Sequence, residues 1–477
     1  MGRYLACFKA YDVRGVVPDE LNPDLAYRIG RAYADHTGAE TVCVGFDIRL
    51  SGPELCDALC KGLNEAGADA VRLGLIGTEM VYFATAFYGF DGGVMITASH
   101  NPPEYNGMKM VTSESRPISS DTGLDEIERR AFEAKWERSG KGSVREQGIY
   151  GDFVKHLLGF VDARRLKPLR IAMDAGHGAA GVALEALLPH LPIHPEKISF
   201  RPDGAFPKGV PNPILPESRA EIEGLLRDRA RGSRGPENPA PQSNIQSPAR
   251  NAEPPFDFGV AWDGDYDRCF FLDGEGRFIE GYYIVGLLAQ ALLSAEPGQT
   301  IIYDPRLVWN TLDIVDRLRG RAVVCKSGHA FIKEKMRAEN AVYGGEMSAH
   351  HYFRRHWYCD SGLIPLLLVA GLVSESGRSL SELVWGMMDR FPCSGEINFR
   401  VTDAPAAIAD VEAKYADGKI DRIDGLSVEF PEWRFNLRGS NTEPVIRLNV
   451  EARGNRPLVE EKTREITEIV RSQESAA

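Results

Sequence analysis

The strongest constraint on the fold is an alternation of short apolar, strand-like runs with helical stretches through most of the chain. Helical patterns at residues 52–67 and 282–295 separate several of these runs. Strands that alternate with helices predict layered α/β domains. A chain of 477 residues has room for roughly three to four such domains. The clearest strand-like runs are residues 41–46, 70–73, 93–96, 169–173, 258–261, 300–303 and 321–325.

Charge and composition argue against two classes of partner. The formal net charge of −12 disfavours nucleic-acid binding. No apolar run reaches the ~20 residues of a membrane span, and the N-terminus lacks the basic and apolar regions of a signal peptide. We therefore expect a cytoplasmic protein with no membrane or nucleic-acid partner. Its eight cysteines show no pairing pattern, which indicates reduced thiols, and Cys56 and Cys60 are expected on a helix face rather than as metal ligands.

One serine lies where an apolar strand ends. Residues 93–96 predict a buried strand, and Pro102 must terminate it because proline fixes φ and lacks an N–H donor. The intervening residues, among them Ser99 and His100, should therefore be exposed on a tight polar turn. Ser99 is a candidate nucleophile in this turn, although an ordinary Ser/Asn turn has the same pattern.

Three carboxylates follow another apolar strand at i, i+2 and i+4: Asp263, Asp265 and Asp267. With a glycine for the turn they can converge on one hard cation, and oxygen-only ligands suit Mg²⁺. A calcium-binding EF-hand needs glycine and glutamate where this chain has Arg268 and Gly274, so that loop is excluded. A solvated acidic hairpin is the alternative.

A phosphate-binding pattern lies near the C-terminus. Arg438 begins a turn that also contains Ser440, Asn441 and Thr442. A guanidinium binds phosphate through its planar fork, and turn N–H groups form an anion nest. Arg447, on the next apolar strand, could support the same site, whereas a capping turn is the alternative.

A fourth polar segment opens with two glycines and contains Glu346, Ser348 and His350. A carboxylate, a hydroxyl and an imidazole are suited to hydrogen-bonding vicinal sugar hydroxyls. A metal pair of His350 with His351 is disfavoured because adjacent strand residues point to opposite faces.

Taken together, these segments resemble the alpha-D-phosphohexomutase superfamily, most closely its bacterial phosphomannomutase/phosphoglucomutase members. The resemblance rests on four motifs in family order, which are TASHNP around Ser99, DGDYDR from Asp263, GEMSAH around Glu346 and RGSNT from Arg438. It implies an α/β protein with four domains around a central cleft, three of them related α/β domains and the last a distinct α+β C-terminal domain. The expected domains are residues 1–145 with the phosphoserine loop, 146–277 with the metal-binding loop and a flexible Pro-rich insert at 230–255, 278–389 with the sugar-binding loop, and 390–477 with the phosphate-binding loop.

The resemblance implies an isomerase, an intramolecular phosphotransferase. Phosphorylated Ser99 would donate its phosphoryl group to a hexose phosphate, give a hexose 1,6-bisphosphate, and take back the other phosphate after the intermediate turns over. Mg²⁺ would be held by the three aspartates and the Ser99 phosphate. The expected reaction interconverts mannose 1-phosphate and mannose 6-phosphate, and also the glucose phosphates, in support of GDP-mannose and polysaccharide synthesis. The alternative is a mutase restricted to glucose or to amino-sugar phosphates; monomer and dimer both remain open.

Further residues receive roles from the same resemblance. Arg14 and His100 match groups beside the phosphoserine, and Lys109 matches a lysine that manages the proton of the sugar hydroxyl. Neighbouring cations would lower the pKa of Lys109 and let it act as a base, whereas a surface lysine is the alternative. Glu346 and Ser348 should hold the 3- and 4-hydroxyls, which mannose and glucose share. The other expected substrate contacts are Tyr11, Arg268, Arg306 (lysine in many relatives), His329, His350, Arg438, Ser440, Asn441, Thr442 and Arg447.

The segment 230–255 departs from the family pattern. It contains six prolines and one large aliphatic residue, Ile245, so it cannot form a core and is expected to be a tolerated surface loop. Its deletion should leave turnover unchanged, because loop closure entropy grows slowly with length.

A glycine-rich turn offers a rival from another reaction class. Residues 176–181 fit G-x-G-x-x-G, follow the strand-like run 169–173, and precede Glu196 at the spacing of a dinucleotide-binding fingerprint. The resembling family has a similar turn with no nucleotide role, which favours the mutase over a dehydrogenase. A second rival, a degenerate mutase or scaffold, is disfavoured by the intact Ser99, aspartate and Arg438 motifs.

Overall fold

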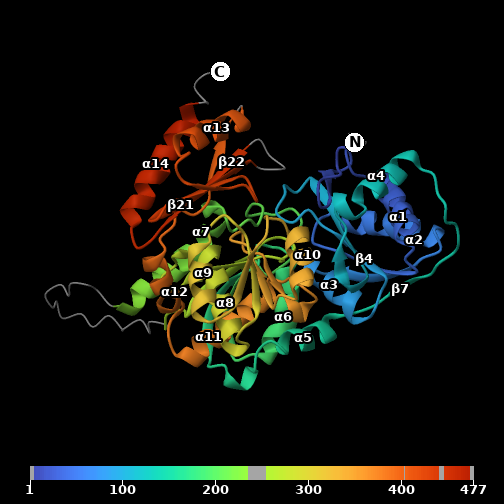
Figure 1. The fold of residues 1–477 in the computed structure, drawn as a ribbon. Helices are drawn as coiled ribbons and strands as arrows, with labels where there is room; N and C mark the ends of the chain where they lie inside the picture. Colours follow the sequence, from blue (N-terminus) through green and yellow to red (C-terminus); the bar gives the residue numbers. More distant parts are fainter. Residues whose placement is uncertain (1–4, 235–253, 402, 440–444, 473–477) are drawn as a thin grey trace. The chain divides into compact units, whose positions relative to one another are not determined.

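The computed structural model describes residues 5–234, 254–401, 403–439 and 445–472. The chain forms two compact units (Figure 1). Unit 1 consists of Met1–Ile279 with Cys359–Ser381, and unit 2 of Glu280–Tyr358 with Glu382–Ala477. The chain therefore passes from one unit to the other three times.

The first sheet of unit 1 carries the predicted serine turn. Its strands lie in the order β1-β5-β4-β2-β3-β7, with β6 paired to β5. Strands β4, β2, β3 and β7 are mutually parallel, whereas β5 runs antiparallel to both β4 and β1. The strands are β1 (Val13–Val16), β2 (Thr41–Phe46), β3 (Asp69–Leu75), β4 (Gly92–Ile96), β5 (Tyr105–Thr112), β6 (Arg116–Pro117) and β7 (Val144–Glu146).

Helices cover both faces of this sheet. The helices α1 (Pro23–Thr37), α2 (Gly52–Glu65) and α4 (Leu124–Glu133) share one apolar core with Val42 and Val44 of β2. The intervening Cys43 points the other way, because strand side chains alternate, and its Sγ lies 3.3 Å from Thr85 Oγ1 of α3 (Thr78–Phe87). The result is an α/β/α layer, in which α1 and α2 lie side by side (Figure 1).

Local sequence signals explain the ends of α1. Asn22 caps its N-terminus by accepting a hydrogen bond from the Leu25 N–H, and Pro23 occupies the first helical position. Gly38 ends the helix with a φ of 69°, a left-handed conformation that glycine adopts without a steric penalty.

The second sheet of unit 1 carries the predicted metal loop. Its order is β12-β11-β10-β8-β9, with β8 parallel to its two neighbours and β10 antiparallel to β11. The strands are β8 (Leu169–Asp174), β9 (Ile193–Ile198), β10 (Phe258–Trp262), β11 (Cys269–Asp273) and β12 (Phe278–Ile279). The helices are α5 (Tyr150–Leu158), α6 (Ala180–Leu187), α7 (Pro216–Arg234) and α11 (Leu363–Ser376), and the short strand β17 (Cys359–Asp360) precedes α11.

Helix α7 corrects one detail of the sequence analysis. It continues to Arg234, so residues 230–234 are helical rather than part of the expected loop. The helix packs Ile222 and Leu226 against Phe256 and Leu272, and Arg229, at the start of its last turns, lies over the Phe256 ring with Cζ 5.6 Å from the centroid. Residues 235–253 of the predicted flexible insert lie outside the described residues.

Unit 2 contains two further sheets. The first has strands β14, β13, β15 and β16 as successive neighbours, and the second has the antiparallel order β18-β22-β21-β20-β19. The strands are β13 (Thr300–Tyr303), β14 (Arg321–Val324), β15 (Tyr343–Gly345), β16 (His351–Phe353), β18 (Ile397–Arg400), β19 (Lys419–Asp421), β20 (Leu426–Glu429), β21 (Trp433–Gly439) and β22 (Val445–Ala452). The helices are α8 (Gly281–Ala295), α9 (Trp309–Arg317), α10 (His329–Glu339), α12 (Leu380–Arg390), α13 (Ala404–Lys414) and α14 (Arg456–Ser472).

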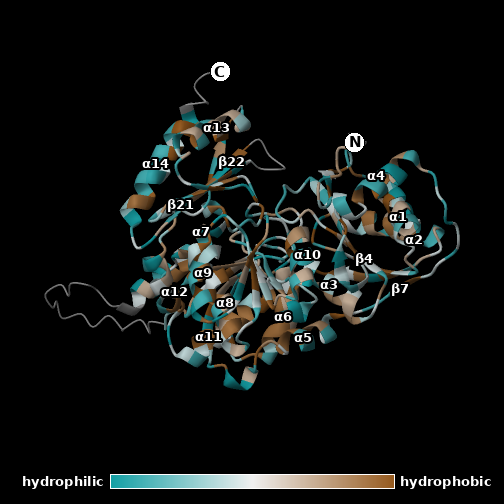
Figure 2. Cartoon of the chain, viewed as in Figure 1, coloured by the Kyte–Doolittle hydropathy of each residue, from teal (hydrophilic) through white to brown (hydrophobic). Residues whose placement is uncertain are grey.

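Hydropathy follows these layers. Figure 2 shows α14 largely in the hydrophilic colour, whereas strands of the sheets are brown. In the last sheet, Phe435 and Leu437 of β21 and Leu448 and Val450 of β22 are fully buried. The C-terminal domain thus has its own core, in agreement with the predicted α+β domain.

All eight cysteines are free and buried. Cys56 and Cys60 both lie on α2. Among the described helices, no single one is long and apolar enough to cross a membrane; only the bent pair α11 and α12 reaches that length and composition together.

Candidate active site

The turn after β4 holds Ser99 in a constrained conformation. Its φ is 47°, in the left-handed region that residues with a Cβ rarely adopt. The side chain is buried, with the residue only 3 % exposed, so the predicted exposure of this turn was wrong. The reason is the loop after β10, which packs on the turn so closely that a Cβ added to Gly264 would lie 2.5 Å from the Ser99 carbonyl oxygen.

The hydroxyl of Ser99 faces an acid and an imidazole. Ser99 Oγ donates to Asp263 Oδ2 at 2.7 Å, and His100 Nδ1 lies 3.0 Å from Ser99 Oγ. His100 Nδ1 accepts from Arg268 Nη2 at 2.5 Å, so this nitrogen carries no proton. Burial, together with the charges of Arg268 and Arg14, holds the pKa of His100 well below its usual range, and the ring is neutral.

The three predicted metal ligands converge. Asp263, Asp265 and Asp267 are buried, and one oxygen from each lies within 4.8 Å of the others. Asp265 Oδ1 has no hydrogen-bond partner, which is costly for a buried carboxylate unless a cation binds it. An all-oxygen set of this kind fits Mg²⁺.

Lys109 lies among these carboxylates. It is on β5, and its Nζ is 2.7 Å from Asp265 Oδ2 and 2.5 Å from Asp267 Oδ2. Burial lowers its pKa, but the two carboxylates outweigh burial and raise it above the ordinary value. The nearest charged neighbours of Lys109 are thus anions rather than the expected cations, and its role as a base stays a prediction.

Two arginines complete the charged surroundings of Ser99. Arg14, on β1, donates from Nη1 to Asn101 Oδ1 at 2.6 Å. Arg268 donates from Nε to Asp263 Oδ2 at 2.8 Å. Tyr11 lies in the segment just before β1, partly buried. Unit 1 thus brings together the predicted catalytic and metal-ligating residues.

In unit 2, the predicted sugar loop joins β15 to β16. Glu346 is buried, and its carboxylate accepts from the Gly328 N–H at 3.0 Å and from the Tyr352 hydroxyl at 2.5 Å. His350 Nδ1 lies 3.7 Å from Glu346 Oε2. His329 is the first residue of α10, beside Gly328. Glu346 thus lies close to His350 and to the backbone beside His329.

Arg306 connects that cluster to the C-terminal domain. Its guanidinium binds both oxygens of Asp304 at 2.9 and 3.0 Å, and it also donates to Ser348 Oγ at 3.2 Å and to Glu396 Oε2 at 3.3 Å. A bidentate pair of this kind fixes the plane of the guanidinium. Arg306 is 2 % exposed and so is held rather than freely solvated.

Three arginines of unit 2 surround one carboxylate. Arg438 and Arg447 are directly opposed on β21 and β22, and both lie 3.8 Å from Glu396, which Arg306 also contacts. Like charges directly opposed on neighbouring strands are unfavourable unless an anion lies between them. The cluster can therefore bind an anion. Ser440, Asn441 and Thr442 of the predicted phosphate loop lie outside the described residues.

Several of these contacts involve residues that the sequence analysis did not select. Asp304 follows the strand run 300–303. Asp47, which accepts from Thr97 Oγ1, and Arg49, which donates to the Ser99 carbonyl oxygen, follow the run 41–46. Polar residues at the carboxyl end of parallel strands often line a site. Their position just after a predicted strand could therefore have identified these three residues as candidates. Glu396 has no such signal, since it precedes an antiparallel edge strand.

The glycine-rich turn 176–181 supports the metal loop. The Ala179 N–H donates to the Gly264 carbonyl at 3.1 Å, and a Cβ on Gly178 would lie 2.8 Å from that carbonyl. Glu196 is exposed on β9. The glycines therefore allow close packing of two loops, which explains the motif without a nucleotide.

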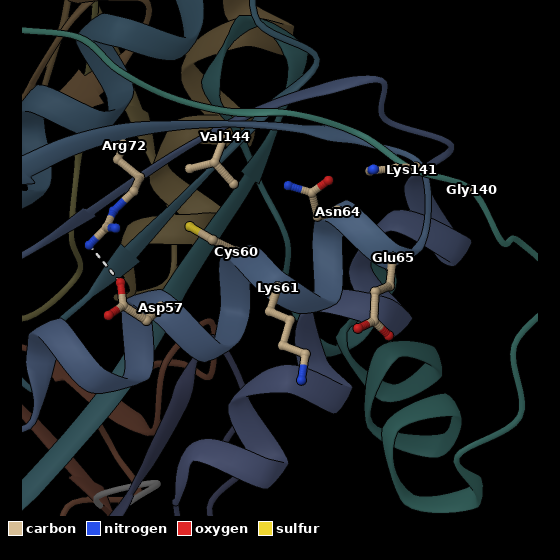
Figure 3. Close-up of a pocket in the computed structure, with 9 residues that line it drawn as sticks. All are labelled: Asp57, Cys60, Lys61, Asn64, Glu65, Arg72, Gly140, Lys141 and Val144. Atoms are coloured by element: carbon tan, nitrogen blue, oxygen red, sulfur yellow. Dashed lines mark ion pairs between the residues drawn. The ribbon is translucent and has the colours of Figure 1, made fainter.

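A separate cavity of about 480 Å³ lies beside α2 (Figure 3). Its wall includes Cys60, Lys61 and Lys141, and Arg72 pairs with Asp57 across one side at 2.6 Å. None of its lining residues belongs to the motifs above.

Comparison with known families decides the relationship. The alpha/beta/alpha domains I, II and III of Phosphoglucomutase/phosphomannomutase match residues 6–138, 150–276 and 280–391, and the C-terminal domain of the same family matches residues 396–469. The chain belongs to the phosphoglucomutase/phosphomannomutase family. Membership confirms the predicted fold of three α/β domains and a C-terminal domain.

Relatives in this family align along almost the whole chain. A protein named phosphohexose mutases from Xanthomonas campestris is 52% identical over 98% of this chain and 99% of its own. A phosphomannomutase from Salmonella montevideo is 49% identical over the same shares. A phosphoglucomutase/phosphomannomutase family protein from Burkholderia thailandensis has a solved structure that covers 99% of this chain and 98% of its own, with a TM-score of 0.83 at 30% identity.

Proposed function

We propose that this phosphoglucomutase/phosphomannomutase family member interconverts mannose 1-phosphate and mannose 6-phosphate, and also the two glucose phosphates. The observation that carries the proposal is the buried Ser99 hydroxyl, 2.7 Å from an aspartate of a three-carboxylate cluster. The curated relatives named phosphomannomutase at 45–49% identity support mannose as the substrate sugar. The sugar-phosphate substrates and the free cysteines support a cytoplasmic enzyme of the nucleotide-sugar supply.

Ser99 is the proposed phosphoryl carrier. In one half of the reaction the Ser99 Oγ–P bond breaks, and a new bond forms between phosphorus and a hydroxyl oxygen of the hexose phosphate. The hydroxyl proton leaves the sugar, and the serine oxygen gains a proton. The bisphosphate then turns over and the same exchange runs in reverse at its other end. Such transfer requires alignment and neutralised charge more than covalent chemistry.

Three cations of this chain can neutralise that charge. Arg14 and Arg268 contact residues of the Ser99 turn, and Lys109 lies beside the aspartate cluster. Neutral His100 keeps its Nδ1 as an acceptor beside the serine oxygen. Bound Mg²⁺, held by the three aspartates, would add positive charge at the phosphoryl oxygens.

Unit 2 is the proposed substrate-binding part. Arg306, Arg438 and Arg447 would bind the phosphate that does not react, since they already surround a carboxylate. Glu346, Ser348, His329 and His350 would bind sugar hydroxyls. Tyr11, Ser440, Asn441 and Thr442 are retained as further substrate contacts.

The test is ³¹P NMR of the purified protein with Mg²⁺ and a trace of hexose 1,6-bisphosphate. Mannose 1-phosphate and glucose 1-phosphate are supplied separately to the native chain and to Ser99→Ala. We expect both to become 6-phosphates with the native chain and neither with the variant. Turnover of only one of the two sugars would restrict the proposed substrate to that sugar. If neither reacts, amino-sugar phosphates are supplied next, and their turnover would show that the substrate assignment is wrong. Full activity of Ser99→Ala would reject the phosphoserine mechanism.

A further inference from the structure

Arg49 lies directly below the Ser99 turn. It follows β2, whose last residue, Phe46, is paired with Ile96 at the end of β4. Both strands are parallel, so their carboxyl ends meet at one edge and place Arg49 beside the turn. The residue is 1 % exposed, and its side chain is completely buried. A cation is rarely buried to this degree without dedicated partners.

Its partners are four backbone carbonyls of the turn. Nη2 donates to the Ser99 and Asn101 oxygens at 2.9 and 2.6 Å, and Nη1 donates to the Pro102 and Tyr105 oxygens at 2.7 Å each. The two terminal nitrogens carry four N–H groups in total, and each has one acceptor. One planar group therefore fixes the backbone at both ends of the turn.

The guanidinium itself is held on two sides. Asp47 Oδ2 lies 3.8 Å from Nε, and the Phe206 ring centroid lies 5.3 Å from Cζ. Opposite charge and a ring face both favour a guanidinium in a buried place. Because its own position is fixed by these contacts, Arg49 can fix the position of the turn carbonyls that it binds.

Asp47 reaches the same turn by a second route. Its Oδ2 accepts from Thr97 Oγ1 at 2.6 Å, and Thr97 Oγ1 accepts from the Ser99 N–H at 2.8 Å. Ser99 is therefore held at its N–H through Asp47 and at its carbonyl through Arg49. A residue with a φ of 47° keeps this conformation only when its surroundings fix it, and these two routes do so.

We propose that Arg49, anchored by Asp47, is a positioning residue that keeps the Ser99 hydroxyl directed at the aspartate cluster. The expected effect of Arg49 on activity rests on the proposed function, whereas its expected effect on the conformation of the turn does not. Lysine cannot replace it, because an ammonium has three donors on one atom and cannot reach four separated carbonyls. No group of Arg49 needs to contact substrate.

The first experiment compares the native chain with Arg49→Lys and Arg49→Ala. We expect kcat with mannose 1-phosphate to fall about 100-fold in both, the usual cost of a slightly misplaced reacting group, with KM within about twofold. Methylguanidinium should restore part of the activity of Arg49→Ala only. Arg72→Ala is the matched control, since Arg72 is more exposed and pairs with Asp57 away from the turn. Full activity of Arg49→Lys would overturn the proposal.

A second measurement does not depend on activity. Hydrogen exchange of the Asn101 and Tyr105 amides, which bond to Ala98 and Pro102 within the turn, should be at least about tenfold faster in Arg49→Lys. Amides of α1 should keep their native rates, which shows that the fold is intact. Unchanged exchange in the turn would reject the positioning role, whereas an inactive native chain with faster exchange in the variant would reject only the proposed function.

Discussion

At the scale of single residues, the site is built from buried charges that satisfy one another. Lys109 lies between two aspartates, Arg268 contacts Asp263, and Glu396 lies within reach of three arginines. The types and order of most of these residues could be predicted from the motifs. Their burial could not, because it depends on which loop packs against which, as the buried Ser99 shows.

Glu396 offers a direct test of the arginine cluster. Its carboxylate partly neutralises Arg306, Arg438 and Arg447, so a substrate phosphate must compete with it. In Glu396→Gln we expect KM for mannose 1-phosphate to fall several-fold, with the thermal stability of the free protein lowered by like-charge repulsion. Steady-state kinetics and thermal unfolding measure the two effects. Glu432→Gln, at an exposed position, is the control, and an increased KM would contradict this interpretation.

At the scale of elements, the predicted strands agree closely with the structure. The runs 41–46 and 300–303 coincide with β2 and β13, and the run 169–173 with all but the last residue of β8. Short apolar runs bounded by turn residues were sufficient for this. The meeting of Ser99 with the metal loop followed only from the family resemblance, because it joins loops of two different sheets and no apolar pattern indicates it.

Gly264 tests that contact between loops. A Cβ in Gly264→Ala would lie 2.5 Å from the Ser99 carbonyl oxygen, so the two loops must separate. We expect kcat to fall about 100-fold and Mg²⁺ affinity, measured by calorimetry, to weaken. Gly224→Ala is the matched control, since nothing lies within 4 Å of its Cβ on α7. Equal activity of both variants would show that the loops need not touch.

The β15–β16 pair should make stability depend on pH. Burial and the neighbouring His350 lower the pKa of His351 from 6.5 to about 3. The unfolded chain takes up this proton below 6.5 and the folded chain does not until about 3, so stability falls as pH falls through that window. His351→Gln removes this contribution. The urea midpoint of each protein is measured at one pH above the window and at one pH inside it. The change in midpoint between the two pH values should be smaller for the variant than for the native chain. An equal change in both proteins would contradict this role of His351.

At the scale of the whole molecule, the proposed phosphoryl carrier and the proposed phosphate-binding arginines belong to different units. Unit 1 contains Ser99 with the carboxylate cluster, and unit 2 contains the arginine cluster. The four-domain order could be predicted from the resemblance. No motif or composition change indicated that residues 359–381 belong to unit 1, since this segment lies inside the third family domain.

This division predicts two separate ligand responses. Mg²⁺ alone should slow hydrogen exchange around Asp263 and Asp267 in unit 1, and inorganic phosphate alone should slow it around Arg438 and Arg447 in unit 2. Mass spectrometry of peptides from each unit measures both. Protection of unit 1 by phosphate without Mg²⁺ would contradict the assignment of the arginine cluster.

The late return of the chain to unit 1 has a consequence for its synthesis. Helix α11 is largely buried, and the Trp262 indole N–H donates to the carbonyl of its N-cap residue, Gly362, at 2.8 Å. Without this helix, Trp262 at the end of β10 lacks that hydrogen-bond partner. A nascent chain that has emerged only as far as Ile279 lacks that helix. The ribosome must therefore translate about a hundred further residues before α11 can pack beside the metal loop. Unit 1 cannot complete its folding until this later segment has been made.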